Sequence, residues 1–301
     1  MDRRTFLRVS GAAGVTAAVA GTACARGVSL GASAPAPSGA RGAQGDPFML
    51  SQVGVQLYSV RKLMQQDAER ALGEVRAAGY QLVETAGIPA GLSASAFRAM
   101  LDRAGLRTSS GHYPLEQFEQ NDAAVIASAG TLGQEFVVLP FLPPAMRGSR
   151  DAYVALADRM NAFGEHARAA GVRFAYHNHD FEFAMFGGAT TALETLIERT
   201  DPKLVSFELD AYWAYKAGHD PVRLFERFPG RFALCHLKDG TGAPERRIAD
   251  VGAGVIDFRR LLSLAGTAGL RYGFVEHDEP VDAIASIRAS HDHLRRLLTG
   301  G

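Results

Sequence analysis

The chain has 301 residues, and its 32 lysines and arginines equal its 32 aspartates and glutamates in number. This balance speaks against a nucleic-acid-binding or membrane-surface protein, because such proteins carry a surplus of basic residues. Of the two cysteines, Cys24 lies in or beside an N-terminal targeting segment, so Cys235 is left without a partner for an internal disulfide.

The first residues have the pattern of a bacterial twin-arginine export signal. Arg3 and Arg4 precede a short, weakly apolar run rich in alanine and glycine, Val9–Ala23. A permanent membrane anchor is the alternative, but the run is short for a membrane span. We expect cleavage after Ala25, or else lipid attachment at Cys24. The mature protein is therefore expected to be periplasmic or exported, with no membrane span after processing.

Composition divides the chain into three regions. The signal peptide is predicted to cover residues 1–26, and residues 27–47, rich in Gly, Ala, Ser and Pro, are typical of a flexible linker. Residues 48–301 remain for the folded domain, a length that suits one α/β barrel.

Within this domain, β-rich runs alternate with segments of helical periodicity. The predicted strands are Val53–Tyr58, Leu82–Thr85, Arg107–Gly111, Phe136–Pro140, Arg173–Asn178, Val205–Asp210, Phe232–Leu237 and Tyr272–His277. The clearest predicted helices are Asp67–Ala78, Ser93–Ala104, Asp151–Ala170 and Val281–Leu298. Eight such units predict a closed (β/α)8 TIM barrel, with an open doubly wound sheet as the alternative. No G-x-G-x-x-G motif follows the first strand, so a dinucleotide-binding fold has little support.

The last four strands all end in residues that can bind metal or move protons. The carboxyl ends of parallel strands meet at one rim of a barrel, where such folds keep their chemistry. Two imidazoles and two carboxylates suit Mn²⁺, Co²⁺, Fe²⁺ or Zn²⁺ better than Ca²⁺, with Mg²⁺ a further option. The sequence therefore predicts one divalent metal ion held by His177, Asp210, His236 and Glu276.

Taken together, the motifs resemble those of the sugar phosphate isomerase/epimerase family of xylose isomerase-like barrels. The resemblance runs from about Gln52 to Leu298 and is carried by GVQLYSVR (54–61), VE (83–84), GH (111–112), YHNH (176–179), ELD (208–210), HLKD (236–239), GAGVIDF (252–258) and VE (275–276). In that family one divalent metal is usually held by Glu, Asp, His and Glu on strands five to eight, which implies the same four residues here.

One position departs from the family pattern. The usual Glu-Asn-His is His177-Asn178-His179 in this chain. The proton shuttle between two facing glutamates is therefore in doubt. Glu276 is the first candidate for the catalytic base, and either His177 or Glu182, five residues further on, is the candidate for the second acid/base.

A further set of residues is predicted to contact substrate. Trp213 is the only tryptophan and could stack on a sugar ring, and Lys238 could stabilise an oxyanion. For each of these residues an ordinary structural role is the alternative. The full predicted substrate set is Glu84, His112, His179, Trp213 and Lys238.

The predicted function is a metal-dependent isomerase or epimerase that acts on a sugar or keto-sugar through an enediolate. The same intermediate serves a lyase or dehydratase, which is the main alternative. A nuclease of the same superfamily and a sugar-binding barrel without catalysis are weaker alternatives. We expect a small carbohydrate partner, unphosphorylated because the enzyme is exported, and no nucleic acid. The sequence does not predict the oligomeric state.

Overall fold

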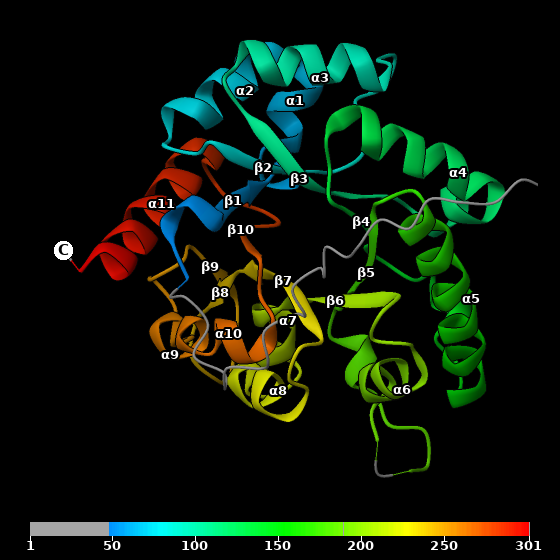
Figure 1. Ribbon diagram of the computed structural model, residues 1–301. Helices are drawn as coiled ribbons and strands as arrows, with labels where there is room; N and C mark the ends of the chain where they lie inside the picture. The colour runs from blue at the N-terminus through cyan, green and yellow to red at the C-terminus, as the bar shows by residue number, and fades with distance from the viewer. Residues whose placement is uncertain (1–47, 189, 301) are drawn as a thin grey trace, which may run out of the picture. The chain divides into compact units, whose positions relative to one another are not determined.

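The computed structural model describes residues 48–188 and 190–300. Eight parallel strands close into a barrel in which the first pairs with the last (Figure 1). The barrel strands are β1 (Val53–Gln56), β2 (Leu82–Thr85), β3 (Arg107–His112), β4 (Phe136–Leu139), β5 (Arg173–His177), β6 (Val205–Asp210), β7 (Phe232–Leu237) and β10 (Tyr272–Val275). The predicted TIM barrel is confirmed, and the open sheet is wrong.

Helices surround the barrel and carry the chain from one strand to the next. They are α1 (Arg61–Gln66), α2 (Ala68–Ala77), α3 (Ala94–Arg103), α4 (Leu115–Leu132), α5 (Arg150–Ala169), α6 (Ala192–Arg199), α7 (Ala211–Lys216), α8 (Pro221–Arg227), α9 (Phe258–Ser263), α10 (Ala265–Ala268) and α11 (Ala283–Thr299). Short 3-10 turns are η1 (Leu50–Gln52), η2 (Leu57–Val60), η3 (Pro144–Met146) and η4 (Phe181–Phe183).

Local sequence explains where several helices begin and end. The N-cap residues Asp67, Ser93 and Asp257 each accept a hydrogen bond from a backbone N–H three residues later. Gly105 and Gly269 follow α3 and α10 with φ of 68° and 81°. Only glycine adopts this left-handed conformation without strain, so it stops the helix and releases the chain toward the next strand.

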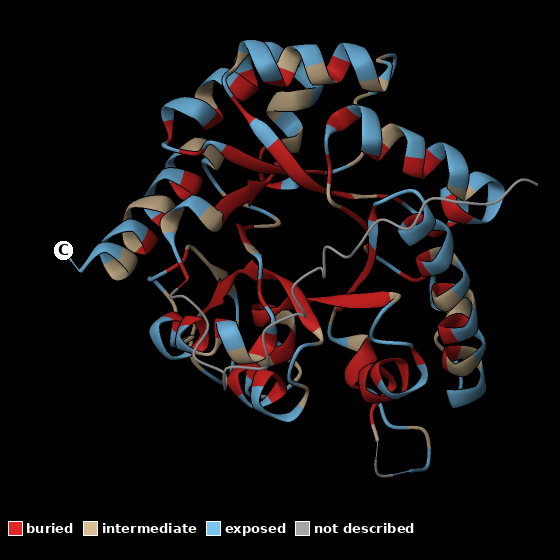
Figure 2. Cartoon of the chain, viewed as in Figure 1, coloured by how far each residue is buried: buried red, intermediate tan, exposed pale blue. Residues whose placement is uncertain are grey.

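The apolar core has two layers. The larger one lies between strands and helices, and Figure 2 shows the buried faces of the helices turned toward the barrel. The smaller one fills the barrel interior with Leu82, Phe136, Val138, Ala175, Ala233, Leu234 and Phe274. Because side chains alternate along a strand, the next inward-facing positions lie at the carboxyl ends of the strands. Those positions are polar, and they form the site described below.

Two strands end two residues earlier than predicted. The strand predicted to reach Tyr58 ends at Gln56, whose side chain accepts a hydrogen bond from the backbone N–H of Tyr58 and starts the turn η2. The strand predicted to reach His277 ends at Val275, and the backbone N–H of His277 donates to the Ser59 hydroxyl instead of to the sheet. Glu276 is thus the first residue after β10.

A small hairpin of β8 (Asp239–Gly240) and β9 (Ile248–Ala249) follows β7 and was not predicted, since strands of two residues leave no periodic pattern. Within residues 48–188 and 190–300, no helix combines the length and apolar character needed to cross a membrane. The predicted signal peptide, the linker and the lipid site at Cys24 lie outside the described residues.

Candidate metal centre and substrate site

The site is built from the carboxyl ends of six barrel strands. Glu84 comes from β2, His112 from β3, His177 from β5, Glu208 and Asp210 from β6, His236 from β7, and Glu276 from the residue after β10. Side chains two apart in a strand share a face, so Glu208 and Asp210 both face the barrel interior, at two depths. The site therefore has an upper group near the mouth and a lower group beneath it.

The upper group contains the predicted metal ligands. Donor atoms of Asp210, His236 and Glu276 all lie within 4.8 Å of one another. His236 Nδ1 is 3.0 Å from Glu276 Oε2 and 3.9 Å from Asp210 Oδ2. His177 Nε2 is also 3.9 Å from Asp210 Oδ2. The structure brings the four predicted ligands together.

Asp210 carries the feature that best fits a cation. Its Oδ1 accepts a hydrogen bond from the backbone N–H of Trp213, but its buried Oδ2 accepts none from the described residues, although the Lys238 ammonium lies 3.3 Å away. A buried carboxylate oxygen that accepts no hydrogen bond is costly, and a bound cation would offset that cost. Two ligand atoms about 2.0–2.3 Å from one ion lie roughly 3–4.5 Å apart, which matches the spacing around Oδ2. The residues present therefore fit a divalent metal.

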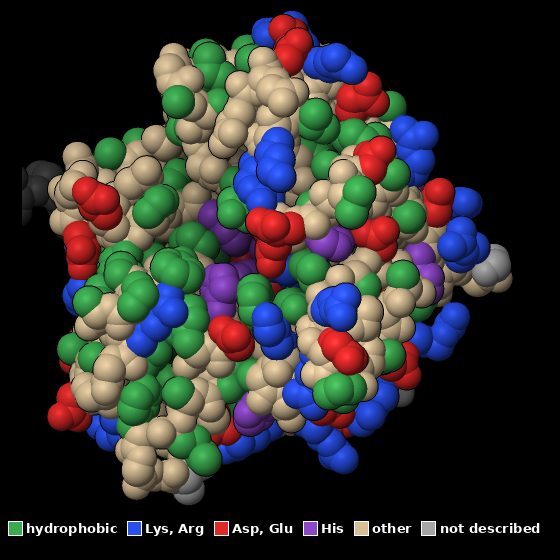
Figure 3. Space-filling model, turned by 180° about the vertical axis from the view of Figure 1, so that it is seen from behind, with side chains coloured by type: hydrophobic (Ala, Val, Ile, Leu, Met, Phe, Trp, Pro, Cys, Tyr) green, Lys and Arg blue, Asp and Glu red, His purple; other side chains and the backbone are tan. Residues whose placement is uncertain are grey.

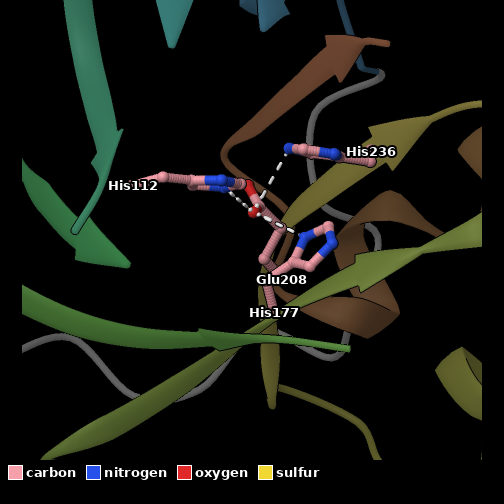
Figure 4. A group of neighbouring side chains, drawn as sticks. All are labelled: His112, His177, Glu208 and His236. Atoms are coloured by element: carbon pink, nitrogen blue, oxygen red, sulfur yellow. Dashed lines mark hydrogen bonds and ion pairs between the residues drawn. The ribbon is translucent and has the colours of Figure 1, made fainter. Parts of the chain in front are cut away.

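The lower group converges on one oxygen of Glu208 (Figure 4). Glu208 Oε2 is 2.8 Å from His112 Nε2, 3.0 Å from His177 Nδ1 and 3.2 Å from His236 Nε2. Glu84 Oε2 lies beside it, 2.7 Å from His236 Nε2 and 3.2 Å from His112 Nε2. His177 and His236 thus belong to both groups, because in each ring one nitrogen faces the upper group and the other faces the lower group.

Burial and neighbouring charges raise the pKa of two carboxylates of the site and lower the pKa of two others. Burial raises the pKa of Asp210 to about 6, and burial together with the charge of Glu84 raises that of Glu208 to about 7. Burial acts the same way on Glu276 and Glu84, but facing cations outweigh it. Lys238 and His236 hold the pKa of Glu276 well below its usual range, and His112 and His236 do the same for Glu84.

The pKa values of the three imidazoles are likewise shifted in opposite directions. Burial and the charge of His236 hold the pKa of His177 well below its usual range, which keeps this ring neutral. Burial opposes charge on His112 too, yet Glu84 and Glu208 raise its pKa to about 9. For His236, Glu208 and Glu276 overcome burial and raise the pKa well above its usual range.

Lys238 places a buried ammonium group beside the upper group. Its Nζ lies 2.8 Å from Glu276 Oε2, 2.7 Å from Asp278 Oδ1 and 3.3 Å from Asp210 Oδ2. Burial alone would lower its pKa, but the three carboxylates raise it above the usual value. Lys238 is therefore charged and lies beside Glu276, the predicted catalytic base.

Aromatic side chains line one side of this group. The His179 ring lies 5.4 Å from those of Trp213 and Phe141 and 5.5 Å from that of Phe181, and Phe141 is 45% exposed. His179 Nδ1 and Trp213 Nε1 are buried and have no hydrogen-bond partner among the described residues. These atoms can bond a ligand that reaches the wall.

Glu182 is not brought into this group. Its carboxylate accepts hydrogen bonds from the Tyr176 hydroxyl at 2.5 Å and the backbone N–H of His179 at 2.8 Å. Tyr176 belongs to the outer core layer, on the opposite face of β5 from His177. Burial raises the pKa of Glu182 to about 7. Glu182 therefore supports the turn after β5, and its predicted catalytic role is not carried forward.

The sequence interpretation missed Glu208 as a site residue, although it noted the Glu208-Leu209-Asp210 motif. The signal was the spacing of two, which places Glu208 on the same face as Asp210. The predicted site residues also did not include Gln56, whose Nε2 donates to Glu84 Oε2 at 2.9 Å, or Asp278, which pairs with Lys238. Single polar residues near strand ends are common, so only the barrel register singles these out.

On the face of the molecule drawn in Figure 3, the surface is hollowed near its middle. Histidine side chains lie in that hollow, and hydrophobic, acidic and basic side chains surround it. Such a mixed rim suits a small polar ligand with apolar faces better than an extended polyanion.

Known proteins share this architecture. A sequence profile of xylose isomerase-like TIM barrels matches residues 72–297. The chain belongs to this family. An inosose dehydratase of Lacticaseibacillus casei is 26% identical over 192 residues, covering 57% of this chain and 63% of that protein. The match thus spans less than two thirds of the length of this relative.

Solved structures of the family superpose over most of the chain. A sugar phosphate isomerase/epimerase from Parabacteroides distasonis has a TM-score of 0.72 at 26% identity, covering 82% of this chain and 96% of the other. The IOLI protein with a bound zinc atom has a TM-score of 0.65 at 15% identity, covering 83% and 98%, a likeness of fold alone.

Proposed function

We propose that this protein is a divalent-metal-dependent lyase that removes water, or another leaving group, from an unphosphorylated keto-sugar or cyclic keto-polyol. The observation that supports the metal is the clustering of donor atoms around the buried Asp210 Oδ2, which accepts no hydrogen bond from the described residues. Asp210, Glu276, His236 through Nδ1 and His177 through Nε2 would hold the ion. Once bound, a divalent cation supplies Lewis-acid polarisation of the substrate carbonyl and makes the neighbouring C–H bond more acidic.

Glu276 is the proposed base. Both side-chain hydrogen bonds that it accepts from the described residues go to Oε2, which leaves Oε1 for substrate. Its depressed pKa keeps it ionised near neutral pH, so it is ready to accept a proton. The α-carbon of a keto-sugar would lose its proton to this oxygen.

Lys238 is the proposed acid. In β-elimination the electron pair of the C–H bond forms a C=C bond, and the C–O bond at the next carbon breaks. The Lys238 ammonium gives its proton to the departing oxygen, which leaves as water. The proton on Glu276 then returns to Lys238 across the 2.8 Å contact between Oε2 and Nζ, and both groups regain their starting states.

His177 makes elimination the preferred outcome over isomerisation. Isomerisation and epimerisation must return a proton to carbon, and the family's usual two glutamates provide one group for each transfer. Here one ring nitrogen of His177 contacts Glu208, and the other faces the proposed metal ligands. His177 is therefore poorly placed to return a proton to carbon. Elimination needs only the Glu276 and Lys238 pair. The match to inosose dehydratases supports the same choice.

The aromatic wall supports an uncharged, hydroxyl-bearing substrate. His179 Nδ1 and Trp213 Nε1 can hydrogen-bond hydroxyls, and the rings beside them suit the apolar face of a sugar. Two nearby cations are already engaged, which leaves them less available to a phosphate group: Lys238 contacts three carboxylates, and the Arg147 guanidinium donates to the backbone carbonyl of Leu142 and stacks on Phe181.

An isomerase or epimerase is the second candidate. It is favoured by the likeness to a sugar phosphate isomerase/epimerase over 96% of that chain. Both candidates share the first step, removal of an α-proton by Glu276.

The two outcomes can be separated by incubating the metal-loaded protein with keto-sugars and keto-inositols in D₂O, followed by mass spectrometry and NMR. A product lighter by one water supports the lyase. A product of unchanged composition that carries solvent deuterium on carbon would instead establish the isomerase. Substrates recovered without deuterium and without loss of water from the whole panel would contradict both.

A further inference from the structure

We propose that Glu208, with Glu84 beside it, fixes the orientation and protonated nitrogen of both histidine ligands, so that His177 presents Nε2 and His236 presents Nδ1 to the metal. Neither carboxylate contacts the substrate site in this arrangement, and both act as positioning residues. The inference rests on the proposed metal centre. It assigns a role to the lower group, which the proposed reaction does not use.

His177 gives the clearest case. Glu208 Oε2 faces ring nitrogens of His112, His177 and His236, so it acts as the acceptor, and the contact of 3.0 Å with His177 Nδ1 places the ring proton on Nδ1. A neutral imidazole carries one ring proton, so Nε2 is left with its lone pair. That nitrogen faces Asp210 Oδ2 at 3.9 Å. Without Glu208, the ring could flip or adopt the other tautomer, and its lone pair would point away.

His236 is held with the roles of its two ring nitrogens exchanged relative to His177. Its Nε2 lies 2.7 Å from Glu84 Oε2 and 3.2 Å from Glu208 Oε2, so this nitrogen donates to the lower carboxylates. Its Nδ1 faces Glu276 and Asp210, both candidate metal ligands. A cation held by those two carboxylates takes the place of a proton on Nδ1.

The same residues raise the alternative of a second cation among His112, His177, Glu208 and His236, whose donor atoms also cluster. One observation favours hydrogen bonds. All three imidazole nitrogens lie 2.8–3.2 Å from the same oxygen of Glu208, the spacing of N–H···O contacts.

Glu208→Gln is the decisive variant, because the amide keeps the size of the side chain but removes the negative charge on which three imidazoles converge. We expect it to weaken Zn²⁺ or Co²⁺ binding by about 10–100-fold, the usual cost of losing the partner of a ligating histidine. Glu194→Gln is the matched control: this carboxylate is also buried, but it caps α6 and contacts Arg227. Affinity is measured by chelator competition, and circular dichroism checks the fold.

Nitrogen-15 NMR of the histidine rings in the unmodified protein supplies a second measurement that does not depend on the variant folding. It should show His177 with its proton on Nδ1 before metal is added. A proton on Nε2 overturns the inference, as does unchanged metal affinity in folded Glu208→Gln; neither result touches the proposed function. Two ions per wild-type chain would instead establish the second cation site. If wild type binds no divalent ion, the metal centre and this inference fall together.

Discussion

Asp210 is the residue in which structural and metal-binding roles can be separated. One carboxylate oxygen caps α7 through the backbone N–H of Trp213, and the other faces the proposed metal centre and accepts no hydrogen bond from the described residues. Asparagine caps a helix about as well as aspartate but brings no negative charge to the ion.

We therefore expect Asp210→Asn to destabilise the metal-free protein less than Lys238→Met does, because the helix cap is kept and Lys238 retains Glu276 and Asp278 as partners. Metal affinity should fall by at least about tenfold, the lower end of what even a lost supporting contact costs. Elemental analysis of the purified variant and denaturant unfolding measure the two effects. A stoichiometric metal content at limiting metal would show that the ion is held elsewhere.

Lys238 allows a second test, in which a bound metal ion should compensate for the loss of a buried positive charge. Its ammonium compensates buried carboxylates, so Lys238→Met leaves Asp210 and Glu276 with unbalanced charge. Breaking such a buried pair costs about 3–5 kcal/mol, which predicts a marked loss of stability in the metal-free variant. A divalent cation should restore much of that loss.

The measurement is the rise of the melting temperature on adding Zn²⁺, which should be larger for Lys238→Met than for wild type. An equal rise in both proteins would argue that Lys238 and the ion do not share the same carboxylates.

At the scale of elements, the loop after β9 is organised by one carboxylate. Asp239 accepts hydrogen bonds from four backbone N–H groups, those of Gly240, Gly252, Gly254 and Ile256. An asparagine has only one accepting oxygen, so at least one pair of these donors would lose its partner. Leaving buried donors unpaired costs about 1–3 kcal/mol.

Asp239→Asn should accordingly lower the free energy of unfolding by about that amount, as followed by urea denaturation. Asp67→Asn, the same change at a helix N-cap, is the control and should cost little. A variant as stable as wild type would mean that the loop does not depend on Asp239.

The bounds of several strands agree with those predicted from the sequence. Strands such as Leu82–Thr85 and Val205–Asp210 were predicted to the residue because their apolar runs end abruptly in polar side chains. The spacing of two places Glu208 on the face of Asp210, but its depth within the barrel depends on register, which one strand alone does not reveal. The contact of Glu182 with Tyr176 could not be predicted, because η4 sets the direction of this side chain and a distance in sequence carries no direction.

For the whole molecule, metal binding should depend on pH. Burial raises the pKa of Asp210 to about 6, and facing carboxylates raise that of His236 well above its usual range despite burial. A cation must displace the protons that these groups hold at low pH. Affinity should therefore rise with pH from about 5 to 8, by roughly tenfold per unit for each proton released.

Calorimetric titrations of Zn²⁺ in buffers of different ionisation enthalpy measure that proton release directly. Affinity that stayed constant over this range would contradict a centre made of these groups.

The N-terminal segment bears on where the enzyme works. From Arg3 and Arg4 we propose export by the twin-arginine route. Changing both to lysine should leave the precursor in the cytoplasm, as followed by cell fractionation. Globomycin, which blocks lipoprotein maturation, should cause precursor to accumulate if Cys24 carries lipid. Unimpaired export of the double variant would contradict this proposal.

The central claim is that Glu276 removes a proton from the carbon next to a metal-polarised carbonyl. The most direct measurement is the rate of solvent deuterium incorporation, or of α-proton loss, from a keto-sugar in D₂O with wild type and Glu276→Gln at equal metal content. The account predicts a fall of about 10²-fold or more in the variant, the scale of losing a positioned base. An unchanged rate in the fully metal-loaded variant would contradict it.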